Sequence, residues 1–151
     1  QMKDISEILS IDRICDLSAS TKDAVLVELC QLASGAPQVT DPDDFLQAIR
    51  ARERAMSTGI GMGVAIPHAK IASVHDFVMA VGRSIPGMDF DSLDGLPVHI
   101  VILVGASDHQ SLEFLKLIGR IGAMFNRGGF IPRFLDAKGP EEMLHLLSET
   151  E

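Results

Sequence analysis

Cysteine is scarce in this chain, which has two among its 151 residues. Cys15 and Cys30 both lie inside apolar patterns, and a disulfide framework in a chain of this size would need more of them. We therefore expect both thiols to be reduced and the protein to be cytoplasmic.

Long apolar runs are also missing. The longest, residues 100–104 with their neighbours, is far shorter than the about 20 residues that cross a bilayer as a helix. The first residues lack the basic and apolar regions of a signal peptide. We expect no direct membrane insertion and no export.

Positive charge is in the minority, because 13 lysines and arginines face 21 acidic residues, for a net charge of -8 and a pI of about 5.0. Such a field repels phosphate backbones and anionic lipid surfaces, which disfavours nucleic acid as a partner. Any site that binds an anion must then be locally basic.

The length suits one domain with one sizeable core. Hydrophobic residues make up 46% and charged residues 23% of the chain, which is ordinary for a globular protein. The sequence contains no repeat, low-complexity tract or linker. We expect residues 1–151 to form a single compact domain.

Hydrophobic periodicity predicts helices that interleave with strands. Apolar residues at helical spacing, together with capping residues and prolines, predict helices at about residues 21–34, 42–55, 114–125 and from 140 onward. Short apolar or β-branched runs predict strands at 64–66, 77–81 and 98–104, with a turn at Pro86 and Gly87. We therefore predict an α/β fold with a mixed β-sheet of about five strands and helices packed on both faces.

One segment departs from the acidic average of the chain. A glycine-rich loop and a histidine that follows a proline are flanked by four basic residues: Arg50, Arg52, Arg54 and Lys70. Glycines let backbone N–H groups turn toward an anion, and arginine forks match phosphate oxygens. The three arginines alternate along a predicted helix and cannot all face one point. We expect Arg52 to face the site, with Arg54 as the alternative and Arg50 in solvent.

The histidine in this segment, His68, has the properties of a phosphoryl acceptor. The nucleophile must be neutral, exposed on one side and held in line with phosphorus. An imidazole with a pKa near 6.5 meets the first condition, and Pro67 stiffens the backbone before it. Nearby cations would stabilise both the transition state and the phosphohistidine.

Other interpretations of the glycines and acids fail on context. A dinucleotide-binding loop follows a strand and opens a helix, whereas these glycines follow a predicted helix and open a strand. The acidic residues before Gly95 fit a calcium loop poorly, since Ile100 stands where the bidentate glutamate would be. The remaining histidines lack paired ligand spacing. We expect no metal and no dissociable cofactor.

The motif that runs from Arg52 to His68 reads R-E-x-x-x-S-T-G-I-G-x-G-V-A-I-P-H. It resembles the active-site signature of type-2 enzyme IIA domains (EIIA) of the phosphoenolpyruvate-dependent phosphotransferase system (PTS), the fructose, mannitol and nitrogen-regulatory type. The segments GMDFDSLDGLPVHIVILV and SLEFLKLIGRIGAMF also resemble that family. The resemblance spans most of the chain from about Ser20 onward.

This resemblance implies a phosphotransferase component with a phosphohistidine intermediate. His68 would accept a phosphoryl group on Nε2 from an HPr-type histidine phosphocarrier protein and pass it to an enzyme IIB component in sugar uptake. Arg52 matches the family arginine beside the phosphohistidine, and Ser57 and Thr58 match the loop that faces it. The alternative is a stand-alone nitrogen-regulatory module, in which phosphorylation of His68 switches binding to regulatory target proteins.

The chain departs from the family pattern at a few positions. Met62 stands where asparagine is common, and Ala69 stands where glycine often follows the histidine. Many relatives carry a second active-site histidine, and the register places Ser111 there. His109, two residues earlier, is the candidate substitute.

Overall fold

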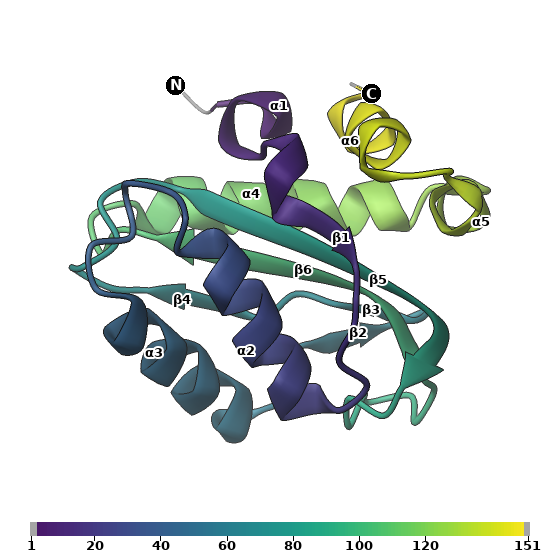
Figure 1. Ribbon diagram of the computed structural model, residues 1–151, viewed down its shortest axis with the longest axis horizontal. Coiled ribbons are helices and arrows are strands. Elements are labelled where there is room, and N and C mark those ends of the chain that lie inside the picture. Colours follow the sequence, from purple (N-terminus) through teal and green to yellow (C-terminus); the bar gives the residue numbers. More distant parts are fainter. Residues whose placement is uncertain (1–2, 150–151) are drawn as a thin grey trace.

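A six-stranded mixed sheet forms the centre of the computed structural model, which describes residues 3–149 (Figure 1). The strand order is β1 (Ile14–Asp16), β5 (Val78–Met88), β6 (Val98–Ala106), β3 (Val64–Ala65) and β2 (Gly59–Gly61), while β4 (His68–Lys70) also pairs with β6. β1 runs parallel to β5, β3 and β4 run parallel to β6, and the β5–β6 and β2–β3 pairs are antiparallel. The predicted mixed sheet is confirmed.

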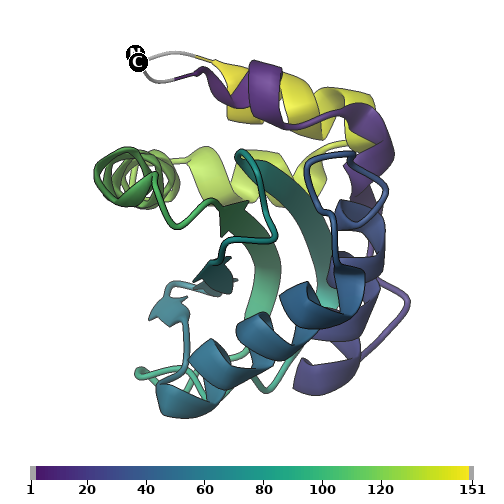
Figure 2. The same cartoon turned by 90° about the vertical axis from the view of Figure 1, so that its left-hand side faces the viewer.

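Helices cover both faces of the sheet, as predicted (Figures 1 and 2). One face carries α2 (Lys22–Ala33) and α3 (Pro42–Ala55). The other carries α1 (Ile5–Ile8), α4 (Ser111–Phe125), α5 (Phe130–Asp136) and α6 (Pro140–Ser148). A short 3-10 helix, Ile11–Arg13, leads into β1. In the part of the chain that the structure describes, no helix has the length and apolarity needed to cross a membrane.

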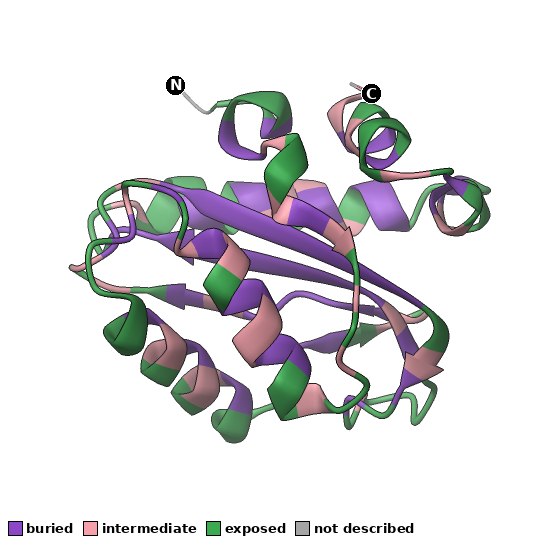
Figure 3. Cartoon of the chain, viewed as in Figure 1, coloured by how far each residue is buried: buried purple, intermediate pink, exposed green. Residues whose placement is uncertain are grey.

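β6 shows how one strand serves two cores. Ile100, Ile102 and Val104 pack into the core beneath α4, α5 and α6, whereas Val101 and Leu103 pack into the core beneath α2 and α3. This follows from the alternation of side chains along a strand. β5 and β6 are therefore buried along most of their length (Figure 3).

The helix that precedes the glycine-rich loop, α3, begins at a capping residue. Asp41 accepts a hydrogen bond from the N–H of Asp44 at 3.1 Å, and Pro42 occupies the first turn, where its missing N–H costs nothing. α3 then runs to Ala55, which matches the prediction. Its end delivers the chain to the loop that carries the motif.

The predicted turn at Pro86 and Gly87 is wrong. β5 continues to Met88 through an irregular stretch, in which the register passes from Arg83 opposite Ile100 to Met88 opposite Val98. A β-bulge of this kind accommodates a proline and a glycine with φ +80° inside a strand. The connection to β6 lies instead at residues 89–97, where acidic side chains accept hydrogen bonds from the turn, among them Asp89 from the N–H of Asp91 at 3.0 Å.

Candidate functional site

His68 lies where the strand beside β6 is interrupted. β3 and β4 follow one another along β6, with Ala65 opposite Val101 and His68 opposite Val104. Pro67 separates them because it has no N–H for the ladder, although its carbonyl accepts from the N–H of Val104 at 3.0 Å. The break leaves the His68 ring half-buried at the start of β4.

The position of the ring indicates which nitrogen of His68 carries the proton. Nδ1 of His68 lies 2.7 Å from the carbonyl oxygen of Ile66. A carbonyl can only accept, so Nδ1 carries the proton, and the neutral ring keeps its lone pair on Nε2. Phe114 from α4 supports the ring, with centroids 5.2 Å apart and planes tilted by 53°. The arrangement leaves Nε2 as the nitrogen with the free lone pair.

The surroundings also keep this imidazole neutral. Burial is the main cause that lowers the pKa of His68 below its ordinary value, and the positive charges of Arg52 and Lys70 lower it further. The hydrogen bond to Ile66 and the negative charge of Glu53 act in the opposite direction. The pKa of His68 is lowered on balance, which favours the neutral ring and a free lone pair on Nε2 at neutral pH.

Arg52 and Glu53 form the last turn of α3 and hold the loop that follows. Nη1 of Arg52 donates to the carbonyl of Met56 at 2.8 Å, which fixes the guanidinium at the helix end. Glu53 is buried and accepts from both the N–H and the hydroxyl of Thr58, and its carboxylate lies 3.0 Å from Nζ of Lys22. Sequence reasoning gave Glu53 no role, although it belongs to the motif.

Ser57 and Thr58 both have protein partners for their hydroxyls. Ser57 donates to the carbonyl of Phe90 at 2.8 Å and accepts from the N–H of Gly59 at 3.1 Å. The hydroxyl of Thr58 donates to Glu53 at 2.6 Å, and its carbonyl accepts from the N–H of Ile66 at 3.0 Å. These bonds shape the loop next to His68, and direct contact of either hydroxyl with a phosphoryl group stays a prediction.

Ser111, rather than His109, contacts the strand that carries His68. Ser111 is the first residue of α4, and Nζ of Lys70 donates to its hydroxyl at 3.4 Å. Lys70 also lies over the Phe114 ring, 5.3 Å from the centroid. The side chain of His109 is 92% exposed, lies 3.5 Å from Asp108, and is not among the groups that shift the pKa of His68. A catalytic part for His109 stays a prediction.

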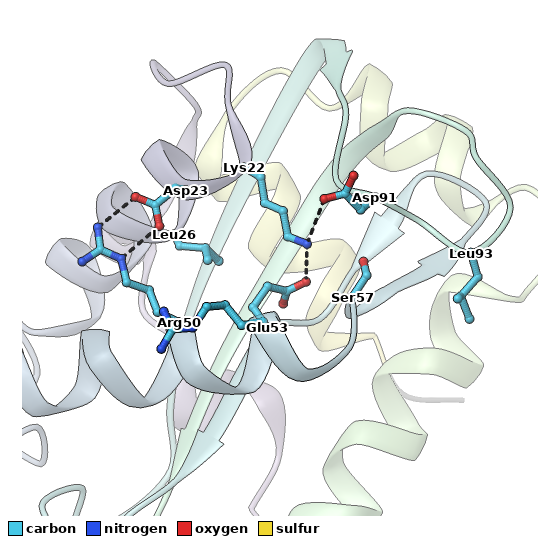
Figure 4. A pocket seen from close by; sticks show the side chains of 9 residues that line it. Lys22, Asp23, Leu26, Arg50, Glu53, Ser57, Asp91 and Leu93 are labelled. Carbon is cyan, nitrogen blue, oxygen red and sulfur yellow. Dashed lines mark hydrogen bonds and ion pairs between the residues drawn. The ribbon is translucent and has the colours of Figure 1, made fainter.

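Arg50 and Arg54 face the other side of α3. Arg50 is half-buried, contrary to expectation, and donates to both carboxylate oxygens of Asp23 at 2.9 and 2.8 Å. Both arginines line a pocket of about 560 Å³ between α2 and α3, whose lining does not include His68 (Figure 4). Of the three alternating arginines, Arg52 is the one whose charge acts on His68. No cluster of three or more potential metal-ligating side chains occurs within residues 3–149.

Comparison with known proteins gives a family match over nearly the whole chain. Residues 7–150 match the model of the phosphoenolpyruvate-dependent sugar phosphotransferase system, EIIA 2. The chain is 32% identical over 146 residues to the fructose-specific EIIABC component of the PTS from Bacillus subtilis. That alignment covers 96% of this chain and 23% of the Bacillus protein, so the chain spans less than a quarter of that relative.

Solved structures share the fold. The nitrogen regulatory protein IIA-Ntr from Neisseria meningitidis has a TM-score of 0.88 at 27% identity, over 95% of this chain and 98% of that one. The mannitol enzyme IIA of Escherichia coli, solved in complex with phosphorylated enzyme IIB, has a TM-score of 0.79 at 20% identity, over 92% of this chain and 96% of that one. With the family match, these findings confirm the resemblance, and the chain belongs to the type-2 EIIA family of the phosphoenolpyruvate-dependent sugar phosphotransferase system.

Proposed function

We propose that the protein is a phosphocarrier that accepts a phosphoryl group on Nε2 of His68 from an HPr-type protein and passes it to an enzyme IIB component. The observation that carries the proposal is the hydrogen bond from Nδ1 of His68 to the carbonyl of Ile66. It places the proton on the nitrogen that faces the protein and leaves the lone pair on the other.

The transfer balances without a net change of protons. The Nε2 lone pair of His68 forms a bond to phosphorus while the bond between phosphorus and the donor histidine nitrogen breaks, and that nitrogen takes the electron pair. Nδ1 keeps its proton, and the carbonyl of Ile66 faces the positive charge that the ring acquires. Arg52 and Lys70, whose charges act on His68, would stabilise the phosphoryl oxygens. Onward transfer reverses these steps.

A regulatory role is the second candidate. The IIA-Ntr structure, at TM-score 0.88, is that of a protein named as nitrogen regulatory, whereas the Bacillus relative is named as a fructose-specific component. In a regulatory module the same phosphohistidine would change the binding of target proteins. The two candidates share the phosphorylation of His68 and differ in the fate of the phosphoryl group.

A phosphorylation assay tests the chemistry that both candidates share. The chain is incubated with phosphoenolpyruvate, enzyme I and HPr, and we expect one phosphoryl group, labile in acid and stable in base, measured by intact mass. His68→Ala should abolish the label. His145→Ala, an exposed histidine on α6, is the matched control and should be labelled like the unmodified chain. Absence of label on the unmodified chain, or label that persists in His68→Ala, would contradict the proposal.

A chase with enzyme IIB proteins separates carrier from regulator. Loss of label from His68, with its appearance on a IIB protein, supports the carrier. Label that persists through a panel of IIB proteins, together with a partner that binds only one phosphorylation state, supports the regulatory module.

A further inference from the structure

The pocket between α2 and α3 has the size of a small-molecule site. Its volume of about 560 Å³ lies within the range of about 300–1,000 Å³ that is typical of such sites. It opens between the start of α2, the second half of α3 and the connection that follows β5 (Figure 4). Nine residues line it: Lys22, Asp23, Leu26, Arg50, Glu53, Arg54, Ser57, Asp91 and Leu93.

One cation of this pocket is available to a ligand. The Nε and Nη2 groups of Arg50 both donate to the carboxylate of Asp23, so this edge of the guanidinium is occupied. Arg54 is exposed, and within residues 3–149 it has no carboxylate oxygen within 4.0 Å and no side-chain hydrogen bond. A free guanidinium fork binds a phosphate group in a bidentate manner. Arg54 therefore offers an anion site at the pocket.

Lys22 provides a second cation that can share an anion. Its Nζ lies 3.0 Å from Glu53 and 3.6 Å from Asp91. The contact with Asp91 is long, and the Asp91 side chain is 76% exposed, so exchanging that contact for a phosphate oxygen costs little. Asp91 would then be free to accept hydrogen bonds from a ligand.

The rest of the lining suits a hydroxylated ligand with an apolar face. Carboxylate oxygens accept from hydroxyl groups, and Asp91 supplies them at the mouth of the pocket. Leu26 and Leu93 supply a small apolar surface, and Leu93 is 81% exposed although it lines the pocket. A ligand that covers Leu93 removes apolar area from water. A dicarboxylate would instead place its second negative charge near Asp91 or Glu53.

We propose that this pocket binds a sugar phosphate, with the phosphate group between Arg54 and Lys22, the hydroxyl groups on Asp91, and the carbon face of the sugar on Leu93. Occupancy would be sensed at the motif, because Glu53 contacts Lys22 on the pocket side and Thr58 on the loop side. The binding itself does not depend on phosphorylation of His68, so it can fail or hold independently of the proposed phosphocarrier function.

Isothermal titration calorimetry on the full chain, with fructose 1-phosphate and glucose 6-phosphate as probes, tests this site. We expect saturable binding of at least one of them, and a loss of about tenfold or more in affinity for Arg54→Ala, equivalent to about 1.4 kcal/mol. Arg133→Ala is the matched control, since Arg133 is an exposed arginine on α5, which covers the opposite face of the sheet. Its affinity should equal that of the unmodified chain. The amide resonance of Thr58 should shift during the titration.

Three results would overturn the proposal. The first is the absence of saturable binding of either sugar phosphate at millimolar concentration. The second is binding of inorganic phosphate as tight as that of the sugar phosphates, which would reduce the pocket to a simple anion site. The third is an equal loss of affinity in Arg54→Ala and Arg133→Ala. Free fructose should not bind, because it lacks the group that Arg54 would hold.

Discussion

Glu53 accepts both hydrogen bonds that Thr58 can donate, one from its N–H at 2.9 Å and one from its hydroxyl at 2.6 Å. The carbonyl of Thr58 in turn accepts from the N–H of Ile66, whose carbonyl accepts from Nδ1 of His68. A buried carboxylate at the end of α3 is thus linked to the His68 ring through two residues, Thr58 and Ile66. We predict that the position of the His68 ring depends on this chain of hydrogen bonds, called the relay below.

Substituting Glu53→Gln tests the relay. The glutamine amide keeps the shape of the Glu53 side chain but loses the negative charge that balances Lys22. Its NH₂ group would also face an N–H or O–H donor of Thr58, with which it cannot form a hydrogen bond as an acceptor. Breaking a buried, hydrogen-bonded ion pair is costly, so we expect the free energy of unfolding to fall by about 2 kcal/mol. Urea denaturation followed by circular dichroism measures it, with an unchanged slope if the folded state is otherwise intact.

Asp23→Asn is the matched control for this prediction. It breaks the ion pair between Arg50 and Asp23. The side chain of Asp23 is 64% exposed, and exposed ion pairs contribute little to the free energy of unfolding. The loss of stability should be clearly smaller than for Glu53→Gln. If both variants lost the same free energy of unfolding, the burial of Glu53 would add nothing to the stability that its ion pair provides.

The lowered pKa of His68 predicts how the site responds to acid. In the unfolded chain the imidazole titrates near 6.5, whereas burial holds the pKa of the folded residue below that value. Above pH 6.5 both states are neutral and stability from this group is fully present. As the pH falls below 6.5 the unfolded state takes up the proton first, so this stability is lost progressively until the pH passes the folded pKa.

An NMR titration of the His68 ring measures this shift. We expect a midpoint below 6.5, and a higher midpoint in Lys70→Ala, which removes one of the positive charges that lower the pKa. Acceptance of the phosphoryl group should persist somewhat below pH 6.5, since it depends on the neutral ring. The resonance is assigned by its loss in His68→Gln. A midpoint at or above 6.5 in the unmodified chain would refute the prediction that the half-buried His68 ring is neutral near pH 7.

Local signals were enough to predict the long elements of the fold. α2 and α3 follow Thr21 and Asp41 as capping residues, and their apolar periodicity is contained in the segment itself. Four strands have only two or three residues each: β1, β2, β3 and β4. Such segments are too short to show the alternation of apolar and polar residues that marks a strand. The sequence predicts only β3 among them, because its composition is strand-like. α5 has seven residues and was missed because it, too, is short. The continuation of β5 through Pro86 depends on β6, which no local pattern reveals.

The candidate site likewise contains residues that the local sequence reveals and residues that only the fold brings together. His68 and Arg52 belong to one local motif together with Glu53 and Thr58, but other side chains that support the ring lie outside it. Phe114 reaches the His68 ring from α4, a contact that only the tertiary fold creates. Lys70 is among the basic residues that flank the motif, but its place on the same side of the chain as His68 follows from β4, a strand that the sequence did not predict.

Arg52 is predicted to stabilise the phosphoryl group, and its removal should slow transfer. Arg52→Ala deletes a positive charge that acts on His68 and the bond to the carbonyl of Met56. Loss of one preorganised donor for transition-state charge costs about 10²–10³ in rate. Rapid-quench measurement of His68 phosphorylation by HPr checks this, with circular dichroism to show that α3 is retained.

Two further variants sharpen the test of Arg52. Arg52→Lys keeps the charge without the fork and should recover part of the rate. Arg133→Ala removes an exposed arginine on α5, which lies on the other face of the sheet, and should transfer at the unmodified rate. If Arg52→Ala also transferred at that rate, the charge beside His68 would have no part in the chemistry.

Met62 holds a backbone conformation that suits its side chain poorly. It lies between β2 and β3 with φ +60°, flanked by Gly61 at +93° and Gly63 at +83°. The left-handed region costs an ordinary residue about 1–2 kcal/mol, whereas asparagine tolerates it better. The Met62 side chain is 48% exposed, so little packing is lost on substitution. We expect Met62→Asn to raise the free energy of unfolding by about 0.5–1 kcal/mol, measured by urea denaturation.

Met56→Asn separates backbone strain from a general effect of the asparagine side chain. Met56 is 61% exposed and has φ −167°, an extended conformation that any residue adopts. Asparagine should bring no gain in stability there, because no strain exists to be relieved. If Met56→Asn stabilised the protein as much as Met62→Asn, the left-handed backbone at Met62 could not be the cause. A gain confined to position 62 would show that the hairpin before His68 is under strain in this chain.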